Sequence, residues 1–208
     1  MIPILRKEFI VQRTLILFYA AATLIFAAQF IPVDEPLPII TILAVFFTFG
    51  TAAHEDKNNS HVLLNSLPVS RKEIVAAKYA FHILIGIGFV VLAAVCKIVA
   101  GGMPAGAALE QSVAAATVVV LFVSVFFPMY FWLGPRFVQI GMIVLFILMF
   151  AAVPMVYNLG AKHGFWGIPV AVRSFPDFLL LALLAIAAIL FLFVSRLVSV
   201  RLYERKQF

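Results

Sequence analysis

Six long apolar runs divide this sequence, and they constrain its fold more than any other feature. They cover residues 14–31, 38–53, 79–100, 108–133, 137–157 and 178–198. A helix needs about 17–25 residues to cross roughly 30 Å of hydrocarbon, and each run approaches or reaches that length. We therefore predict an all-α, polytopic membrane protein with six transmembrane helices, forming a single transmembrane domain over residues 1–208.

Composition excludes a soluble globular domain. Of the 208 residues, 65% are hydrophobic and 12% are charged, whereas soluble domains average about 45–50% apolar and 25% charged residues. Lysine and arginine exceed aspartate and glutamate by 15 to 9. Because the basic residues flank apolar runs, membrane topology explains the excess better than nucleic-acid binding does. Cys96 is the only cysteine, so an intrachain disulfide is impossible.

The first 14 residues mix basic and apolar side chains, which favours an interfacial helix at the N-terminus. A cleaved signal peptide is the alternative interpretation. The run over 14–31 is longer than the usual apolar region of about 7–15 residues in such peptides, and further spans follow it. We therefore favour an uncleaved segment.

Basic residues are distributed unevenly between the two sides of the predicted spans. Twelve fall on one face: Arg6, Lys7, Arg13, Lys57, Arg71, Lys72, Lys78, Arg136, Arg196, Arg201, Arg205 and Lys206. Three fall on the other: Lys97, Lys162 and Arg173. Because cytoplasmic loops carry the excess of basic residues, the first face is expected in the cytoplasm, with both termini inside.

Residues 54–78 form a polar island between the second and third spans. Asn58, Asn59 and Ser60 are good N-cap residues for a short helix. Its apolar side chains would be Val62, Leu63, Leu64 and Leu67. Pro68 would end it, because proline disfavours helical geometry at the preceding residue. The island therefore predicts a short amphipathic cytoplasmic helix.

A second helix start follows at once. Ser70 and Glu73 have the spacing of a capping box, and Val69 and Ile74 that of a hydrophobic staple. A helix from Ser70 to Ala100 would be about 46 Å long at 1.5 Å per residue, which exceeds the hydrocarbon core. This helix would therefore be a rigid lever that joins the island to the far side of the membrane.

Motifs for catalysis or nucleotide binding are absent from the sequence. It contains no phosphate-binding loop, no H-E-x-x-H and no G-x-S-x-G. His54, Glu55, Asp56 and His61 could be imagined as a metal site, but a solvated loop edge is the simpler interpretation. We expect no catalytic residue, no metal site and no cofactor bound by this chain.

Two ionisable residues fall within the third span and are candidates for function by default, His82 and Lys97. Lys97 is four residues from Gly101, so snorkelling toward the outer surface is favoured over a role in the substrate path. Small polar residues occur in the second and fifth spans, namely Thr41, Thr48, Thr51 and Gln139. Such groups either hydrogen-bond between helices or line a path, and we favour the first role.

A family resemblance rests on residues 55–79. It is carried by LLNSLPVSRKEIV at 63–75, with Glu55-Asp56-Lys57-Asn58 before it and Lys78-Tyr79 after it. This stretch is similar to the loop between spans two and three of small, six-span ATP-binding-cassette (ABC) exporter permeases of the type-2 class. Phe127-Pro128-Met129-Tyr130 and Gly134 resemble that family's turn between spans four and five, although Trp132-Leu133 depart from its pattern.

This resemblance implies a permease subunit that moves an amphipathic or hydrophobic substrate outward, such as a peptide, an antibiotic or a lipid-like molecule. It implies separate ABC ATPase subunits, which carry the ATP and magnesium, and a second permease copy or relative. In that family the loop carries the coupling helix that docks on the ATPase, here around residues 59–67. The expected location is the bacterial cytoplasmic membrane.

Two alternatives stay open. The chain could be a membrane assembly or sensor subunit that does not transport. An intramembrane enzyme that uses His82 or His163 is less favoured, because the sequence offers neither a nucleophile motif nor paired carboxylates within the spans. An enzyme should act alone, whereas a transporter should stimulate its ATPase in response to substrate.

The distribution of basic residues makes a topology prediction. In a Cys96→Ala background, Gly102→Cys and His163→Cys should react with an impermeant thiol reagent applied to intact cells. Asn59→Cys should react only after permeabilisation. Labelling of the Asn59 position from outside would reverse the predicted orientation.

Overall fold

The computed structural model describes residues 2–28, 36–57, 70–100, 104–134, 140 and 177–205. These residues form six long helices: α1 (Ile2–Val11), α2 (Arg13–Ala27), α3 (Pro36–Lys57), α5 (Arg71–Val99), α6 (Ala105–Leu133) and α9 (Asp177–Arg205). No strand occurs among them. The prediction of an all-α chain is confirmed for this part of the sequence.

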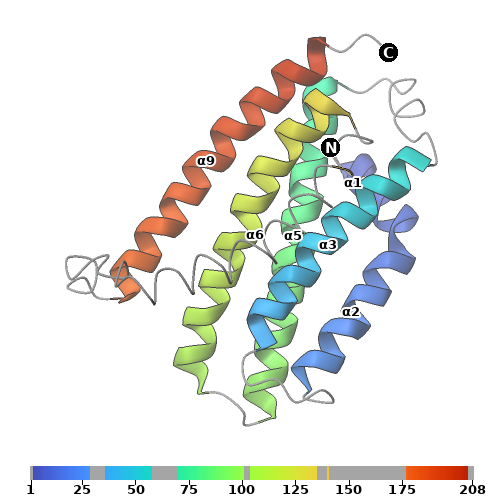
Figure 1. The fold of residues 1–208 in the computed structure, drawn as a ribbon. Coiled ribbons are helices and arrows are strands. Elements are labelled where there is room, and N and C mark those ends of the chain that lie inside the picture. Colours follow the sequence, from blue (N-terminus) through green and yellow to red (C-terminus); the bar gives the residue numbers. More distant parts are fainter. Residues whose placement is uncertain are drawn as a thin grey trace.

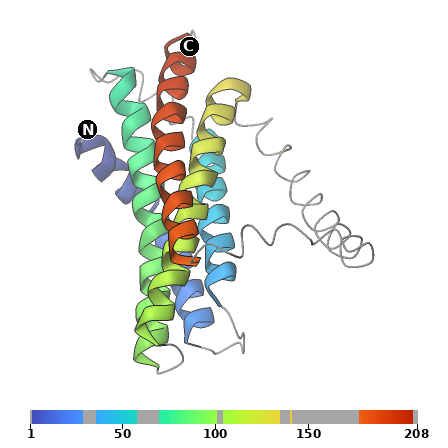
Figure 2. The same cartoon turned by 90° about the vertical axis from the view of Figure 1, so that its left-hand side faces the viewer.

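The helices form an elongated bundle in which α5 has a central place (Figure 1). Helix α5 contacts α1, α2, α3, α6 and α9. Helix α9 packs chiefly along α6, and α2 packs along α3. Both chain termini lie at the same end of the bundle as the start of α5 (Figures 1 and 2). That is the arrangement expected for an even number of crossings; which side faces the cytoplasm stays a prediction.

Three of the described helices are long and apolar enough to cross a membrane: α5, α6 and α9. Helices α1 and α2 qualify only as a bent pair, and α3 contains a shorter apolar stretch, Ile39–Glu55. The predicted fifth span, 137–157, lies almost wholly outside the described residues. A multi-pass membrane protein is therefore supported, whereas the count of six spans stays a prediction.

The N-terminal helix exists, and it is anchored more firmly than an interfacial helix need be. The chain bends by 68° between α1 and α2, with Gln12 at the break. The bend turns α1 against α5. Ile4 and Glu8 of α1 are buried as a result. A buried glutamate in this helix was not anticipated from the sequence.

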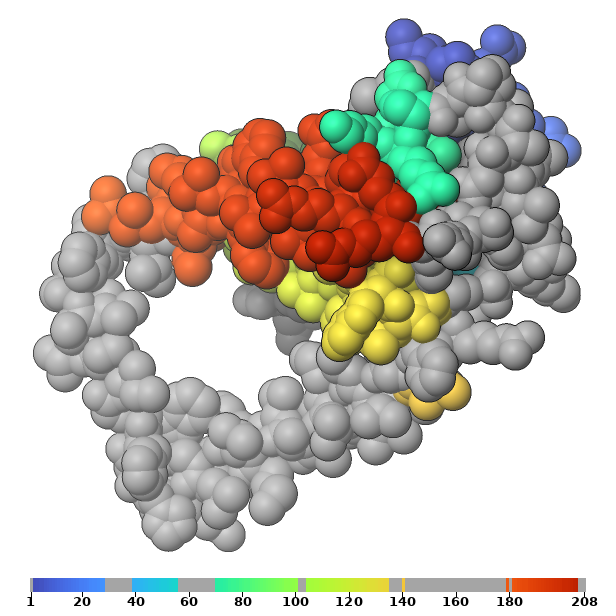
Figure 3. Space-filling view, turned by 90° about the horizontal axis from the view of Figure 1, so that it is seen from above, coloured from blue at the N-terminus to red at the C-terminus, as the bar shows by residue number. Residues whose placement is uncertain are grey.

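Helix α9 has the opposite character, since most of its apolar side chains are exposed. They include Leu183, Leu184, Ile186, Ile189, Leu190, Phe193, Val194 and Leu197. Figure 3 shows α9 along one side of the molecule, with its C-terminal end beside the start of α5. In a bilayer an apolar surface of this kind suits contact with lipid or with another transmembrane helix.

Helices α5 and α6 approach closely at a glycine. A Cβ atom added to Gly86 would lie 2.7 Å from Cγ1 of Val119, closer than carbon atoms pack. Val119 is buried in the core. Small residues at such positions let two membrane helices come together. Gly88, two residues further on, has no neighbour within 4 Å of the same position.

This contrast gives a stability prediction with an internal control. Gly86→Ala should destabilise the protein by about 1–3 kcal/mol through overpacking. Gly88→Ala should be neutral or stabilising by up to about 1 kcal/mol, because alanine favours helix. Equilibrium unfolding of the purified protein in detergent measures both. The cost of Gly86→Ala should shrink in a Val119→Ala background, and equal costs in the two backgrounds would contradict the steric explanation.

Candidate functional site

The segment predicted to dock on an ATPase lies outside the described residues. It contains Asn59, Val62, Leu63, Leu64 and Leu67. Their proposed role therefore stays a prediction. The structure instead describes what this segment leads into, which is the first turn of α5.

The first turn of α5 carries the capping box expected from the sequence. The backbone N–H of Glu73 donates to Oγ of Ser70 at 3.3 Å. The backbone N–H of Ser70 donates in return to Oε2 of Glu73 at 3.2 Å. The helix then runs without interruption to its C-cap at Ala100. The predicted helix is thus present with the predicted ends, Ser70 and Ala100, and its role as a lever stays a prediction.

Arg71 fastens this first turn to the end of α9. Its Nη1 donates to the backbone carbonyl oxygens of Tyr203 and Glu204, at 3.2 and 2.8 Å respectively. Carbonyls in the last turn of a helix have no donor within the helix, and they lie at the negative end of its dipole. The guanidinium of Arg71 supplies the missing donor and places a positive charge at the negative end of the dipole. The beginning of α5 and the end of α9 are therefore held together.

A second tie between helices begins with a missing donor. Pro128 lies inside α6 and has no backbone N–H, so the carbonyl of Ser124, four residues earlier, loses its normal partner. The hydroxyl of Ser195 in α9 donates to that carbonyl oxygen instead. Helix α9 thus supplies the hydrogen bond that proline removed from α6.

The same serine connects to α5. Oη of Tyr79 lies 2.7 Å from Oγ of Ser195 and 2.8 Å from Oγ of Ser199. Each hydroxyl has one proton to donate. Because Ser195 donates to the Ser124 carbonyl, it must accept from Tyr79, and Tyr79 must then accept from Ser199. Each hydroxyl therefore donates to the next group in one direction, from Ser199 to Tyr79, to Ser195 and to the Ser124 carbonyl of α6. All four residues are buried.

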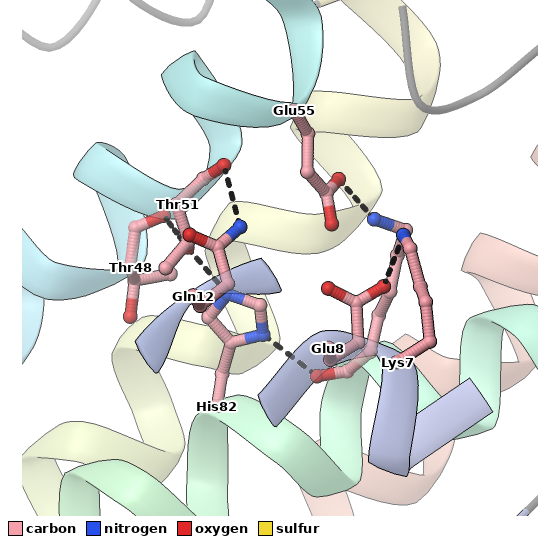
Figure 4. Close-up of polar contacts among 8 residues, drawn as sticks. Lys7, Glu8, Gln12, Thr48, Thr51, Glu55 and His82 are labelled. Carbon is pink, nitrogen blue, oxygen red and sulfur yellow. Dashed lines mark hydrogen bonds and ion pairs between the residues drawn. The ribbon is translucent and has the colours of Figure 1, made fainter. Parts of the chain in front are cut away.

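On another side of α5, polar residues of α1, α3 and α5 meet Gln12, at the break after α1, in a buried cluster (Figure 4). We call it the polar junction; its members are Glu8, Gln12, Thr48, Thr51, Glu55, Lys78 and His82, all largely buried. Glu55 and Lys78 form an ion pair between α3 and α5. Nζ of Lys7 donates to Oε1 of Glu8 at 3.1 Å.

His82 has structural partners at both ring nitrogens. Nδ1 lies 2.7 Å from the carbonyl oxygen of Lys78, which can only accept, so Nδ1 carries a proton. Nε2 lies 2.7 Å from Oγ1 of Thr51 in α3. Thr51 therefore hydrogen-bonds between two helices, which is the role we favoured for the small polar residues. A histidine engaged in this way is poorly placed to act as a catalytic base.

Lys97 is buried, with only 2% of the residue exposed. Snorkelling of this side chain toward the outer surface stays a prediction. The structure does not test a role in the substrate path, and that role stays a hypothesis. The structure assigns no group of three or more potential metal ligands among the described residues. Glu55, imagined above in a metal site, is paired with Lys78.

Sequence reasoning missed two of these features. The polar junction depends on Glu8, whose surroundings in the sequence suggest an exposed surface helix. The second feature is the series of hydrogen bonds from Ser199 through Tyr79 and Ser195 to the Ser124 carbonyl, which we call the donor chain. It could have been suspected, because Ser124 precedes Pro128 by four residues and Ser195 and Ser199 share one helix face. Which helix would supply the missing donor is decided only by packing.

A family comparison covers almost the whole of this arrangement. The family model described as "ABC-2 family transporter protein" matches residues 3–204. The chain belongs to the ABC-2 family of transporter proteins. A comparison with curated proteins gave no match. Membership of the ABC-2 family makes the chain a membrane subunit of a transporter, as the resemblance in residues 55–79 implied, and agrees with the long apolar helices.

The donor chain gives this ABC-2 family member a testable double-mutant cycle. Ser195→Ala should cost about 1–2 kcal/mol in the wild-type background, because the Ser124 carbonyl loses its donor within the bundle. In a Pro128→Ala background the restored backbone N–H can serve that carbonyl. Ser195→Ala should then cost clearly less, as measured by unfolding in detergent. Equal costs would show that Ser195 does not replace the missing donor.

Proposed function

We propose that this chain is the permease subunit of an ABC exporter, driven by separate ATPase subunits that dock on residues 59–67. The substrate would be amphipathic or hydrophobic, such as a peptide, an antibiotic or a lipid-like molecule. ATP and magnesium would be bound by the ATPase alone. A second permease copy or a relative would complete the transporter, with the substrate route between the two halves.

One observation carries this proposal: α5 begins directly after the proposed docking segment and is tied to two other long helices. Arg71 holds the end of α9. Tyr79 reaches α9 and, through Ser195, α6. A displacement of the first turn of α5 is therefore passed to both helices rather than lost in a flexible loop.

Docking itself would depend on the leucines of the segment. Clustered aliphatic side chains facing the cytosol invite a partner surface, and a helix in a groove is the recognition mode expected. Burying one such side chain contributes roughly 1.5–3 kcal/mol, so losing two should weaken docking by about two to four powers of ten.

We therefore expect Leu63→Ala combined with Leu67→Ala to lose the ATPase when the permease is purified with a candidate ABC ATPase. Asn65→Ala combined with Ser66→Ala, in the same segment, is the matched control and should retain it. Co-purification and ATP hydrolysis stimulated by substrate are the readouts. A leucine double variant that holds the ATPase at wild-type yield and still transports would refute docking at this segment.

Ser70→Ala should behave differently, because the cap fixes the helix start rather than the docking surface. Losing an N-cap costs only about 1 kcal/mol. The ATPase should stay bound, while the stimulation of ATP hydrolysis by substrate should fall. A subunit that binds the ATPase but shows no response to any substrate, even as wild type, would favour the non-transporting alternative.

A further inference from the structure

The polar junction contains two glutamates that each lack one hydrogen-bond partner. Glu8 of α1 is 1% exposed and Glu55 of α3 is 5% exposed. Oε2 of Glu8 and Oε1 of Glu55 are buried and have no donor. Burying such an atom without a partner costs roughly 1–3 kcal/mol, and more for a charged group. Oε1 of Gln12 is unpaired as well, so three buried acceptors in the polar junction lack a donor.

The remaining oxygen of each carboxyl group is occupied. Oε1 of Glu8 accepts from Lys7, and Oε2 of Glu55 accepts from Lys78. The two carboxyl groups face each other in Figure 4, and the second oxygen of each is unpaired. The two unpaired oxygens are therefore the ones left for an interaction between Glu8 and Glu55.

Other polar groups nearby are already committed. The ring nitrogens of His82 lie against the Lys78 carbonyl and Thr51. The amide nitrogen of Gln12 points to the carbonyl oxygen of Thr51. From α6, the ring of Tyr130 lies 6.0 Å from Nζ of Lys78. None of these described groups donates to the two unpaired oxygens.

Two carboxylates that share a buried site repel each other, which favours the binding of a proton by one of them, and burial away from water favours it further. A single proton would also satisfy both unpaired oxygens, since the protonated group donates and the other accepts. We propose that the junction is a proton-binding site, in which the Oε2–H of Glu8 donates to Oε1 of Glu55.

The partners decide which glutamate carries the proton. The partner of Glu55 is the almost fully buried Lys78, and neutralising Glu55 would leave that ammonium without its counter-ion. The partner of Glu8 is Lys7, whose side chain is 23% exposed and is partly solvated. Protonated Glu8 can still accept from Lys7 through Oε1. Glu55 is therefore the carboxylate and Glu8 the acid.

The proton holds α1 in place. With it, Glu8 is a donor that joins α1 to α3. Without it, two buried anions face each other, and repulsion favours release of α1 from α3 and α5. Loss of the proton as the pH rises should therefore loosen α1. This inference does not depend on the ATPase or on the identity of the substrate.

Infrared spectroscopy of the purified protein in detergent tests the proton directly. At neutral pH the wild type should show the carbonyl stretch of a protonated carboxylic acid, which should disappear as the pH rises. Glu8→Gln should lack this band, whereas Glu73→Gln, at an exposed glutamate, should keep it. A Glu8→Gln spectrum that matches the wild type would overturn the proposal. A wild type with no such band at neutral pH would overturn it equally, even if the variant failed to fold.

Cysteine accessibility tests the consequence for α1. In a Cys96→Ala background, Ile4→Cys places a thiol at a buried position of α1, and Ile2→Cys provides a control in the same helix; the native residues are 3% and 80% exposed. The ratio of their labelling rates should rise with pH by about tenfold or more, since charge repulsion at a partly buried site is of that size. Added Glu8→Gln should keep the ratio flat, because the amide donates to Glu55 at any pH. The same rise with and without Glu8→Gln would refute the link between the proton and α1.

Discussion

The backbone N–H that Pro128 lacks sets the relation between α6 and its neighbours. In a bilayer no water serves the carbonyl left behind, so a helix with an internal proline needs a donor from elsewhere. Ser195 of α9 provides it, and Tyr79 of α5 is joined to that serine. The missing N–H of Pro128 thus sets the position of α9 along α6 through Ser195, and Tyr79 connects this contact to α5. Apolar packing alone would allow α9 to slide along α6.

Polar contacts of this kind gather toward one end of the bundle. Arg71 holds the last carbonyls of α9, and the ion pair of Glu55 and Lys78 joins α3 to α5. The opposite half of α5 relies more on apolar packing, with Phe89, Val90 and Ala93 buried in the core. An ABC-2 family chain with this distribution has one end where helices are joined by specific bonds.

Local sequence signals predicted the structure where local chemistry decides it. The capping box placed the start of α5 at Ser70, because the donors and acceptors involved lie within four residues of each other. Hydropathy predicted a span over 178–198, and the helix that contains this span, α9, continues to Arg205. Apolarity reports contact with lipid, and a helix can continue into water with Arg196 and Arg201 on its surface.

Features that depend on distant partners could not be predicted. The burial of Glu8 requires the 68° bend after α1 and the packing of α1 against α5, and neither has a local signature. The position of Lys97 near a helix end favoured snorkelling, yet its burial depends on what packs around it. The family, by contrast, was indicated by one contiguous stretch of sequence, residues 63–75, and the family match confirmed it.

The contact between Gly86 and Val119 has a mechanical consequence. It is where the backbone of α5 leaves no room for a side chain against α6. From Ser70 to this point α5 rises about 24 Å, and from it to Ala100 about 21 Å, at 1.5 Å per residue. A tilt about this pivot moves the two ends of α5 in opposite directions by nearly equal distances. An inward push at one face of the membrane becomes an outward swing of similar size at the other.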